Sequence, residues 1–179
     1  MYRDFAEAIC TEAELRASGE RLGLDDYVVL RRRTITVLPV LAVIERALPE
    51  ARQLDGLRNA TADIIAWTND LRSARRELEE GTDNLITVLA RHHRCSLAEA
   101  AAKARTMLAG RMDDFEQGGA GGDRAELIRR ARDGSLAWQR ETRRNTTGSV
   151  TSGEPRRGVR ALARHLAVEV DATGVVDDR

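Results

Sequence analysis

The chain has 179 residues, of which 42% are hydrophobic, and this length is enough for one domain with a buried core. Its 29 basic and 29 acidic residues balance to a net charge of zero, so no bulk attraction to nucleic acid or to a membrane surface is expected. Two cysteines, with no signal-like segment and no 18-residue apolar run, predict a reduced, cytoplasmic protein without a membrane span.

The N-terminal part of the chain predicts three helical segments. Residues 3–18 carry apolar side chains at helical spacing. The next helix is expected to begin at Tyr27, with Asp25 or Asp26 as its N-terminal cap. An apolar helical run then covers residues 37–51. Segments of alternating apolar and polar residues are almost absent, so no sheet is expected.

Residues 54–80 are expected to form the longest helix. Its apolar stripe repeats every seven residues and is widened by neighbouring side chains: Leu57, Ile64, Leu71 and Leu78, with Ala60, Trp67 and Ala74. The other side carries Ala62, Ile65 and Ala66, where a solvated helix would carry charged residues. We therefore expect this helix to be buried on one side and to face a cavity on the other.

Three further helices are expected in the second half of the chain, each with its own capping residue. They cover residues 83–93, 96–117 and 123–144, capped by Asp83, Ser96 and Asp123. From residue 146 onward Gly, Ser, Thr and Pro become frequent, as they are in linkers. The chain therefore divides into a helical domain, 1–145, and a Gly/Ser/Arg-rich tail, 146–179, which we expect to be largely disordered apart from one short helix.

Three oxygen-bearing residues, Asn69, Ser73 and Glu77, follow one another at intervals of four in the longest helix. At about 100° per residue, their side chains spread over only about 80° of the helix surface. Amide, hydroxyl and carboxylate oxygens are hard ligands that suit Mg²⁺, which keeps open positions for water or phosphate. The spacing therefore predicts a magnesium site, with a coincidental polar face as the alternative.

Residues 69–77, Asn-Asp-Leu-Arg-Ser-Ala-Arg-Arg-Glu, resemble the second metal-binding motif of class I terpene synthases, (N/D)DxxSxxxE. The match is complete and includes Asp70 after the Asn and the basic Arg76 before the Glu. The resemblance covers residues 1–145 and corresponds to the C-terminal half of such a synthase. It implies an all-α helical bundle with part of the class I terpenoid synthase fold.

Residues 27–34, Tyr-Val-Val-Leu-Arg-Arg-Arg-Thr, are similar to the YLxLRRxT segment of the same family. The resemblance implies that Arg32 senses the substrate diphosphate and that the helix breaks at Ile35-Thr36. Thr36 stands where the family usually has Gly, and Pro39 removes a backbone donor and is expected to loosen the helix there.

The end of the helical domain, residues 138–145, is similar to the family's C-terminal Trp…Arg-Tyr segment. Arg144 matches the Arg that closes over the diphosphate, whereas Asn145 replaces the Tyr. An amide can still donate a hydrogen bond, so the resemblance keeps Arg144 as a diphosphate ligand.

The activity implied by the resemblance is Mg²⁺-dependent ionisation and cyclisation of an isoprenyl diphosphate, with farnesyl diphosphate as the expected substrate. The expected metal ligands are Asn69, Ser73 and Glu77, and the expected diphosphate ligands are Arg32, Arg76 and Arg144. The aspartate-rich first metal motif has no match in the sequence. We therefore expect a truncated or split synthase that is a poor catalyst by itself.

Two other functions remain open on the sequence. A non-catalytic helical module, derived from such a synthase, would dimerise through its apolar surface, and the heptad seam at Leu57, Ile64, Leu71 and Leu78 fits either function. An isoprenyl chain-elongating enzyme would carry aspartate-rich motifs in both halves, which the Asn/Ser/Glu pattern disfavours. The partners expected are an isoprenyl diphosphate and either a second copy or a complementary N-terminal half, but neither nucleic acid nor membrane.

Overall fold

The computed structural model describes residues 2–46, 54–118 and 122–141. Every regular element in these ranges is an α-helix, as predicted: α1 Tyr2–Ser18, α2 Leu24–Thr34, α3 Val37–Glu45, α4 Asp55–Glu80, α5 Leu85–His93, α6 Leu97–Gln117 and α7 Asp123–Glu141. None of these helices combines the length and the apolar character needed to cross a membrane. Arg144 and the tail 146–179 lie outside the described residues.

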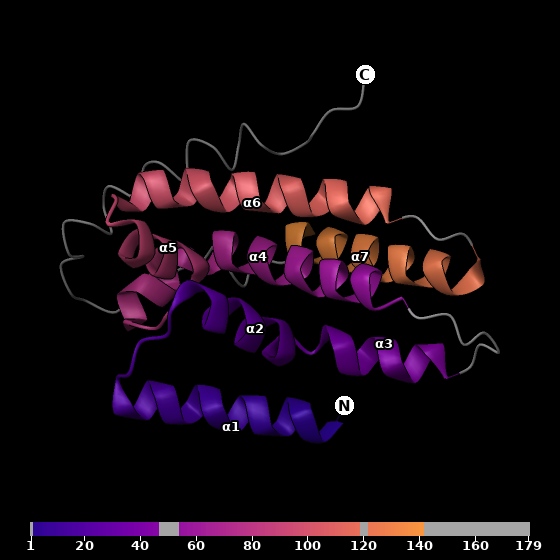
Figure 1. Cartoon of the computed structure of the whole chain (residues 1–179), viewed down its shortest axis with the longest axis horizontal. Helices are drawn as coiled ribbons and strands as arrows, with labels where there is room; N and C mark the ends of the chain where they lie inside the picture. The colour runs from indigo at the N-terminus through magenta and orange to yellow at the C-terminus, as the bar shows by residue number, and fades with distance from the viewer. Residues whose placement is uncertain (1, 47–53, 119–121, 142–179) are drawn as a thin grey trace.

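Helix α4 lies at the centre of the bundle (Figure 1). Helix α6 runs along one side of it, α7 lies behind it in this view, and α2 and α3 follow one another along the opposite side. Helix α5 packs against α4 and α6 at one end, and α1 lies at the edge against α2. The motif-bearing helix is therefore the element on which most of the others pack.

The sequence predicted that α4 faces a cavity along one side, and this expectation is wrong for its first half. Residues 60–67 are all buried, including Ala62, Ile65 and Ala66. Helix α7 packs against this stretch, where the side-chain amide of Gln139 donates to the carbonyl oxygen of Ile65 at 3.1 Å. Small uncharged residues here therefore allow neighbouring helices to approach, and the cavity that adjoins the motif lies beside the second half of α4.

Two apolar clusters form the core and follow one another along α4. The first joins α4 to α2, α5 and α6, with Tyr27, Trp67, Leu85, Leu89 and Ala104 among its buried members. The second joins α4 to α3, α6 and α7, with Leu41, Leu57, Ile64, Phe115 and Ile128. Burial of aliphatic and aromatic side chains contributes about 1.5–3 kcal/mol each, so both ends of α4 are fixed by packing.

Two predicted caps are wrong by one to a few residues. Helix α5 is capped by Asn84, whose side chain accepts from the backbone N–H of Ile86, whereas Asp83 forms ion pairs with Arg21 and Arg91 instead. Helix α2 begins at Leu24, before Tyr27, without a side-chain cap. Asp25 and Asp26 lie in its first turn, where negative charge still interacts favourably with the helix dipole.

The capping box at α6 is confirmed, and Asp123 begins α7 rather than preceding it. Ser96 accepts from the backbone N–H of Glu99, whose carboxylate accepts from the backbone of Ser96 in return. Asp123 is the first residue of α7, so its carboxylate lies in the first turn. Both arrangements place oxygen atoms near the N-terminal N–H groups of a helix, where the predicted caps were expected to act.

The break between α2 and α3 lies at Ile35 and Thr36, where the family resemblance placed it. Thr36 has a left-handed backbone, with φ of 70°. Pro39 is the third residue of α3, and the N–H that proline lacks has no partner within a helix at that position. Pro39 cannot donate to the carbonyl oxygen of Ile35, four residues before it, so it disfavours a continuous helix through the break and fits the first turn of α3.

Replacing Thr36 with Gly is expected to raise the free energy of unfolding by about 0.5–1 kcal/mol. A left-handed backbone costs an L-residue about 1–2 kcal/mol, and the greater freedom of Gly in the unfolded chain offsets part of the gain. The matched control is Thr106→Gly in the exposed part of α6, which should lower stability by about 0.5 kcal/mol. Urea denaturation of both variants measures the difference, and equal destabilisation would contradict the prediction.

Candidate functional site

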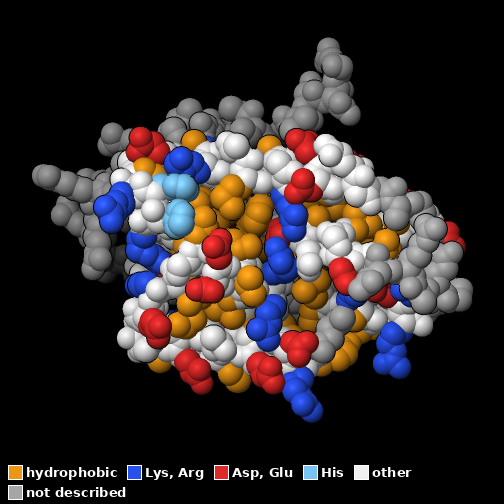
Figure 2. Space-filling model, in the orientation of Figure 1, with side chains coloured by type: hydrophobic (Ala, Val, Ile, Leu, Met, Phe, Trp, Pro, Cys, Tyr) orange, Lys and Arg blue, Asp and Glu red, His pale blue; other side chains and the backbone are white. Residues whose placement is uncertain are grey.

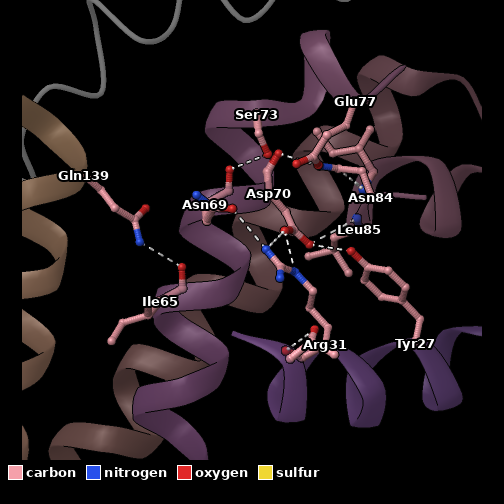
Figure 3. A network of polar contacts seen from close by, with 12 residues as sticks. Tyr27, Arg31, Ile65, Asn69, Asp70, Ser73, Glu77, Asn84, Leu85 and Gln139 are labelled. Atoms are coloured by element: carbon pink, nitrogen blue, oxygen red, sulfur yellow. Dashed lines mark hydrogen bonds and ion pairs between the residues drawn. The ribbon is translucent and has the colours of Figure 1, made fainter. Parts of the chain in front are cut away.

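The predicted metal ligands Asn69, Ser73 and Glu77 lie along one face of α4 (Figure 3). Ser73 is fully buried, whereas Asn69 and Glu77 are partly exposed. The Ser73 hydroxyl donates to the carbonyl oxygen of Asn69 at 2.8 Å. Glu77 Oε2 accepts from the side-chain amide of Asn84 at 2.7 Å. Hydrogen bonds within α4 and from α5 therefore hold the Ser73 hydroxyl and the Glu77 carboxylate in place.

Asp70, the second residue of the motif, is 1% exposed and forms the centre of a hydrogen-bond network. Its Oδ2 accepts from the Tyr27 hydroxyl at 2.6 Å and from the backbone N–H of Leu85 at 3.3 Å. Its Oδ1 accepts from Arg31 Nε at 2.8 Å. Asp70 therefore connects α2, α4 and α5, a role that the sequence analysis did not assign to it.

Arg31, rather than the predicted Arg32, reaches the motif. Besides its contact with Asp70, its Nη2 donates to Asn69 Oδ1 at 3.0 Å (Figure 3). Burial opposes the charged form of this guanidinium, but the neighbouring Asp70 carboxylate outweighs that effect and raises the pKa of Arg31 above its ordinary value. Arg31 is therefore a permanent cation in direct contact with one of the predicted metal ligands.

Arg32 does not reach the motif and lines a depression of the surface between α2, α4 and α6. Its Nε and Nη2 donate to the two carboxylate oxygens of Asp63, each at 2.7 Å, and Arg111 of α6 donates to the same carboxylate at 2.9 Å. Asp63 is buried, and its two ion pairs connect α4 to α2 and to α6. The structure therefore does not bring Arg32 together with Arg76, which lies next to Glu77 with its Nη2 3.3 Å from Oε1.

Asn84 is a further residue that the sequence analysis missed. Its side-chain amide donates to the carbonyl oxygen of Asp70 at 2.8 Å as well as to Glu77, while its oxygen caps α5. A signal for it existed, because a capping residue so close to the end of a helix can reach back to the last turns of that helix. Asn84 therefore fixes the orientation of the Glu77 carboxylate.

A cavity of about 460 Å³ lies between α1, α2 and the second half of α4. The network contributes Tyr27, Arg31, Asp70, Arg76 and Glu77 to its wall. Both basic and acidic side chains line it, and the remaining charged ones are Arg16, Arg21, Glu12, Glu20, Glu80 and Asp83. Such a cavity can hold an anionic group against arginines only if a cation offsets the carboxylates beside it.

The donor chemistry of the motif fits a hard divalent cation that shares its coordination with an anion. Within the part of the chain that the structure describes, no group of three or more His, Cys, Asp and Glu side chains could hold a metal ion. Asn69, Ser73 and Glu77 supply oxygen donors with a single formal charge, which makes a weak site for Mg²⁺. The remaining negative charge would have to come from a bound ligand.

Replacing Tyr27 with Phe is expected to weaken the loss of stability at alkaline pH. Burial, followed by the Asp70 carboxylate, raises the pKa of Tyr27 well above its usual value of about 10. The folded state therefore keeps the phenolic proton where the unfolded chain loses it, so this contribution is complete below about pH 10 and declines as pH rises toward the folded pKa. Urea denaturation between pH 8 and pH 11 (roughly one unit beyond the free phenol value) measures how steeply the free energy of unfolding falls with pH.

Tyr2→Phe is the matched control for that measurement, because Tyr2 is an exposed residue of α1. It should leave the alkaline slope of the parent unchanged. An unchanged slope in Tyr27→Phe as well would show that the Tyr27 hydroxyl is not buried against Asp70 in solution.

The part of the chain that carries this site is similar in sequence to known proteins. A family model described as terpene synthase family 2, C-terminal metal binding, matches residues 1–114. The chain is 38% identical over 106 residues to a germacrene A synthase of Nostoc punctiforme, covering 54% of this chain and 33% of the relative. It is 34% identical over 122 residues to a 7-epi-alpha-eudesmol synthase of Streptomyces viridochromogenes, covering 62% and 36%.

A solved structure shares the arrangement of the helices. The crystal structure of an a-eudesmol synthase aligns with a TM-score of 0.60 and 26% sequence identity, covering 85% of this chain and 54% of that one. The chain therefore spans about a third of the length of the curated relatives and about half of the solved structure.

Proposed function

The chain belongs to terpene synthase family 2, in its C-terminal metal-binding region, and on this premise we propose that it takes part in the Mg²⁺-dependent ionisation and cyclisation of an isoprenyl diphosphate. The observation that carries the proposal is the row of Asn69, Ser73 and Glu77 on α4, of which Glu77 lines a cavity with arginines in its wall. Farnesyl diphosphate is the substrate we propose, because the eudesmol synthase relative is described as cyclizing (2E,6E)-farnesyl diphosphate.

The metal-binding part of the proposal assigns Mg²⁺ to the oxygens of Asn69, Ser73 and Glu77. When bound there with diphosphate, Mg²⁺ would stabilise the negative charge that builds up on the leaving group. Asn84 would hold the Glu77 carboxylate in place, and the Ser73 bond to the Asn69 backbone would fix the hydroxyl. These contacts support a preorganised half-site whose coordination is completed by the ligand.

The diphosphate-binding part of the proposal rests on Arg76, which lines the cavity beside Glu77. Arg32 could serve only after it leaves the Asp63 carboxylate, which Arg111 would continue to neutralise. Arg144 remains a proposed ligand on the strength of the family resemblance alone. We place full catalysis in an assembly in which a second helical unit supplies further metal ligands, since this ligand set has one formal charge.

Calorimetric titration of the intact chain with Mg²⁺, in the presence and absence of inorganic diphosphate, tests the proposal. We expect each ligand to raise the affinity for the other by the same factor, since coupling between two binding sites is reciprocal. Magnesium affinity that is independent of diphosphate would contradict the proposed site. Loss of the coupling in Ser73→Ala, with unchanged helical circular dichroism, would support it.

A non-catalytic interaction module is the second candidate function. It is favoured by the exposed side chains of Val29 on α2 and of Val40 and Val43 on α3. Figure 2 shows hydrophobic side chains gathered across the face over α2, α3 and α6, interrupted by basic ones. Sedimentation equilibrium should then detect self-association that Val40→Asp with Val43→Asp abolishes, whereas a monomeric parent at all concentrations would contradict it.

A further inference from the structure

Arg31 is bound to two residues of the metal motif at once. Its Nε and Nη2 both lie 2.8 Å from Asp70 Oδ1, and Nη2 also lies 3.0 Å from Asn69 Oδ1. The side chain is 17% exposed and lines the cavity between α1, α2 and α4. The same guanidinium therefore touches a structural carboxylate, a metal ligand and the space where an anion would bind.

Of these two contacts, the one with Asp70 is fixed and the one with Asn69 can be exchanged. Asp70 is buried and also accepts from Tyr27 and from the Leu85 backbone, so a loss of its cation would leave a buried charge without compensation. Asn69 is neutral and partly exposed, so its oxygen can exchange a guanidinium for another cation at little cost. Asp70 therefore holds Arg31 in reach of Asn69 whether or not a ligand is present.

We propose that Arg31 is a positioning residue that withholds the Asn69 oxygen from a divalent cation until a diphosphate enters the cavity. This inference rests on the proposed function, because it concerns the same Mg²⁺ site. A guanidinium on Asn69 Oδ1 occupies a lone pair and repels a second cation. An anion in the cavity offers the guanidinium another partner, so the planar group can tilt off Asn69 Oδ1 while its charge stays beside Asp70.

The variant Arg31→Lys separates the two contacts. An ammonium group can keep the charge beside Asp70, but it lacks the planar fork with which Arg31 spans Asp70 and Asn69 together. In calorimetric titration with Mg²⁺ alone, we expect this variant to bind about tenfold more tightly than the parent, the usual scale of one charge-assisted hydrogen bond. The gain should shrink when inorganic diphosphate is present, because the parent then releases Asn69 as well.

Arg33→Lys is the matched control, since Arg33 lies on the same helix and donates to the backbone oxygen of Asp4, away from the motif. It should bind Mg²⁺ as the parent does under both conditions. If Arg31→Lys and the parent bind Mg²⁺ with equal affinity in the absence of diphosphate, this inference is overturned and the proposed function is not. Absence of Mg²⁺ binding in all three proteins, even with diphosphate, overturns the proposed function and this inference with it.

A measurement on the parent protein covers the case in which Arg31→Lys does not fold. The side-chain amide signals of Asn69, assigned in ¹⁵N spectra by their loss in Asn69→Asp, should shift on addition of diphosphate alone, because Nη2 then leaves Oδ1. The side-chain amide of Asn59 on the same helix serves as the reference. Asn69 signals that respond to diphosphate no more than those of Asn59 would overturn the inference.

Discussion

Replacing Asp70 with Asn is expected to lower the free energy of unfolding by about 3 kcal/mol, the usual cost of removing one partner of a buried ion pair. The substitution is nearly isosteric, so the loss comes from chemistry rather than volume. Arg31 loses its counter-charge in a largely buried position. One oxygen also becomes an NH₂ group that faces a donor, either Arg31 or the Tyr27 hydroxyl and the Leu85 N–H.

Asp133→Asn is the control for this measurement, because Asp133 forms an ion pair with Arg132 on the surface of α7. Its carboxylate is 63% exposed, and exposed pairs contribute little to stability. Urea denaturation should therefore show a large shift of the midpoint for Asp70→Asn and almost none for Asp133→Asn. Similar shifts in the two variants would show that the Asp70 network does not hold α2, α4 and α5 together.

The helices themselves could be predicted from the sequence because their signals are local. Apolar spacing depends on residues a few positions apart, and six of the seven helices are where they were expected to within about three residues. The break at Ile35-Thr36 was placed by the family resemblance. The cap of α5 could not be assigned, because Asp83 and Asn84 are both good capping residues. Tertiary contacts distinguish the two, because Asp83 pairs with Arg21 and Arg91 while the amide of Asn84 bonds to α4.

The arginines of α2 show why the site was only partly predictable. Arg31 and Arg32 are neighbours in sequence, but successive side chains of a helix point about 100° apart. One therefore meets Asp70 and Asn69, while the other meets Asp63 and α6. The rotation of α2 about its own axis decides which of the two arginines faces the motif. That rotation is fixed by the packing of Tyr27 in the core and not by any local motif.

Replacing Glu77 with Gln is expected to abolish the coupling between Mg²⁺ and diphosphate. Glu77 supplies the only formal charge among the three proposed ligands, and Mg²⁺ gives up its water molecules reluctantly. A coupling factor in the usual range of about 5–150 for the parent should therefore fall to about one. The fold should be kept, because the amide oxygen of Gln can still accept from Asn84, which donates to Glu77 at 2.7 Å.

Glu79→Gln provides the matched control for the Glu77 experiment. Glu79 lies two residues further along α4 and pairs with Arg75 on its outer surface, so the variant loses the same charge outside the ligand row. Asn69→Asp should also be tolerated, because the family motif permits either residue at this position. Calorimetry with Mg²⁺ and inorganic diphosphate should then show coupling in Glu79→Gln and Asn69→Asp but not in Glu77→Gln. If Glu77→Gln keeps the coupling of the parent, the row of oxygens on α4 has a structural role, and the arginines in the cavity wall would have to bind diphosphate without a metal at this face.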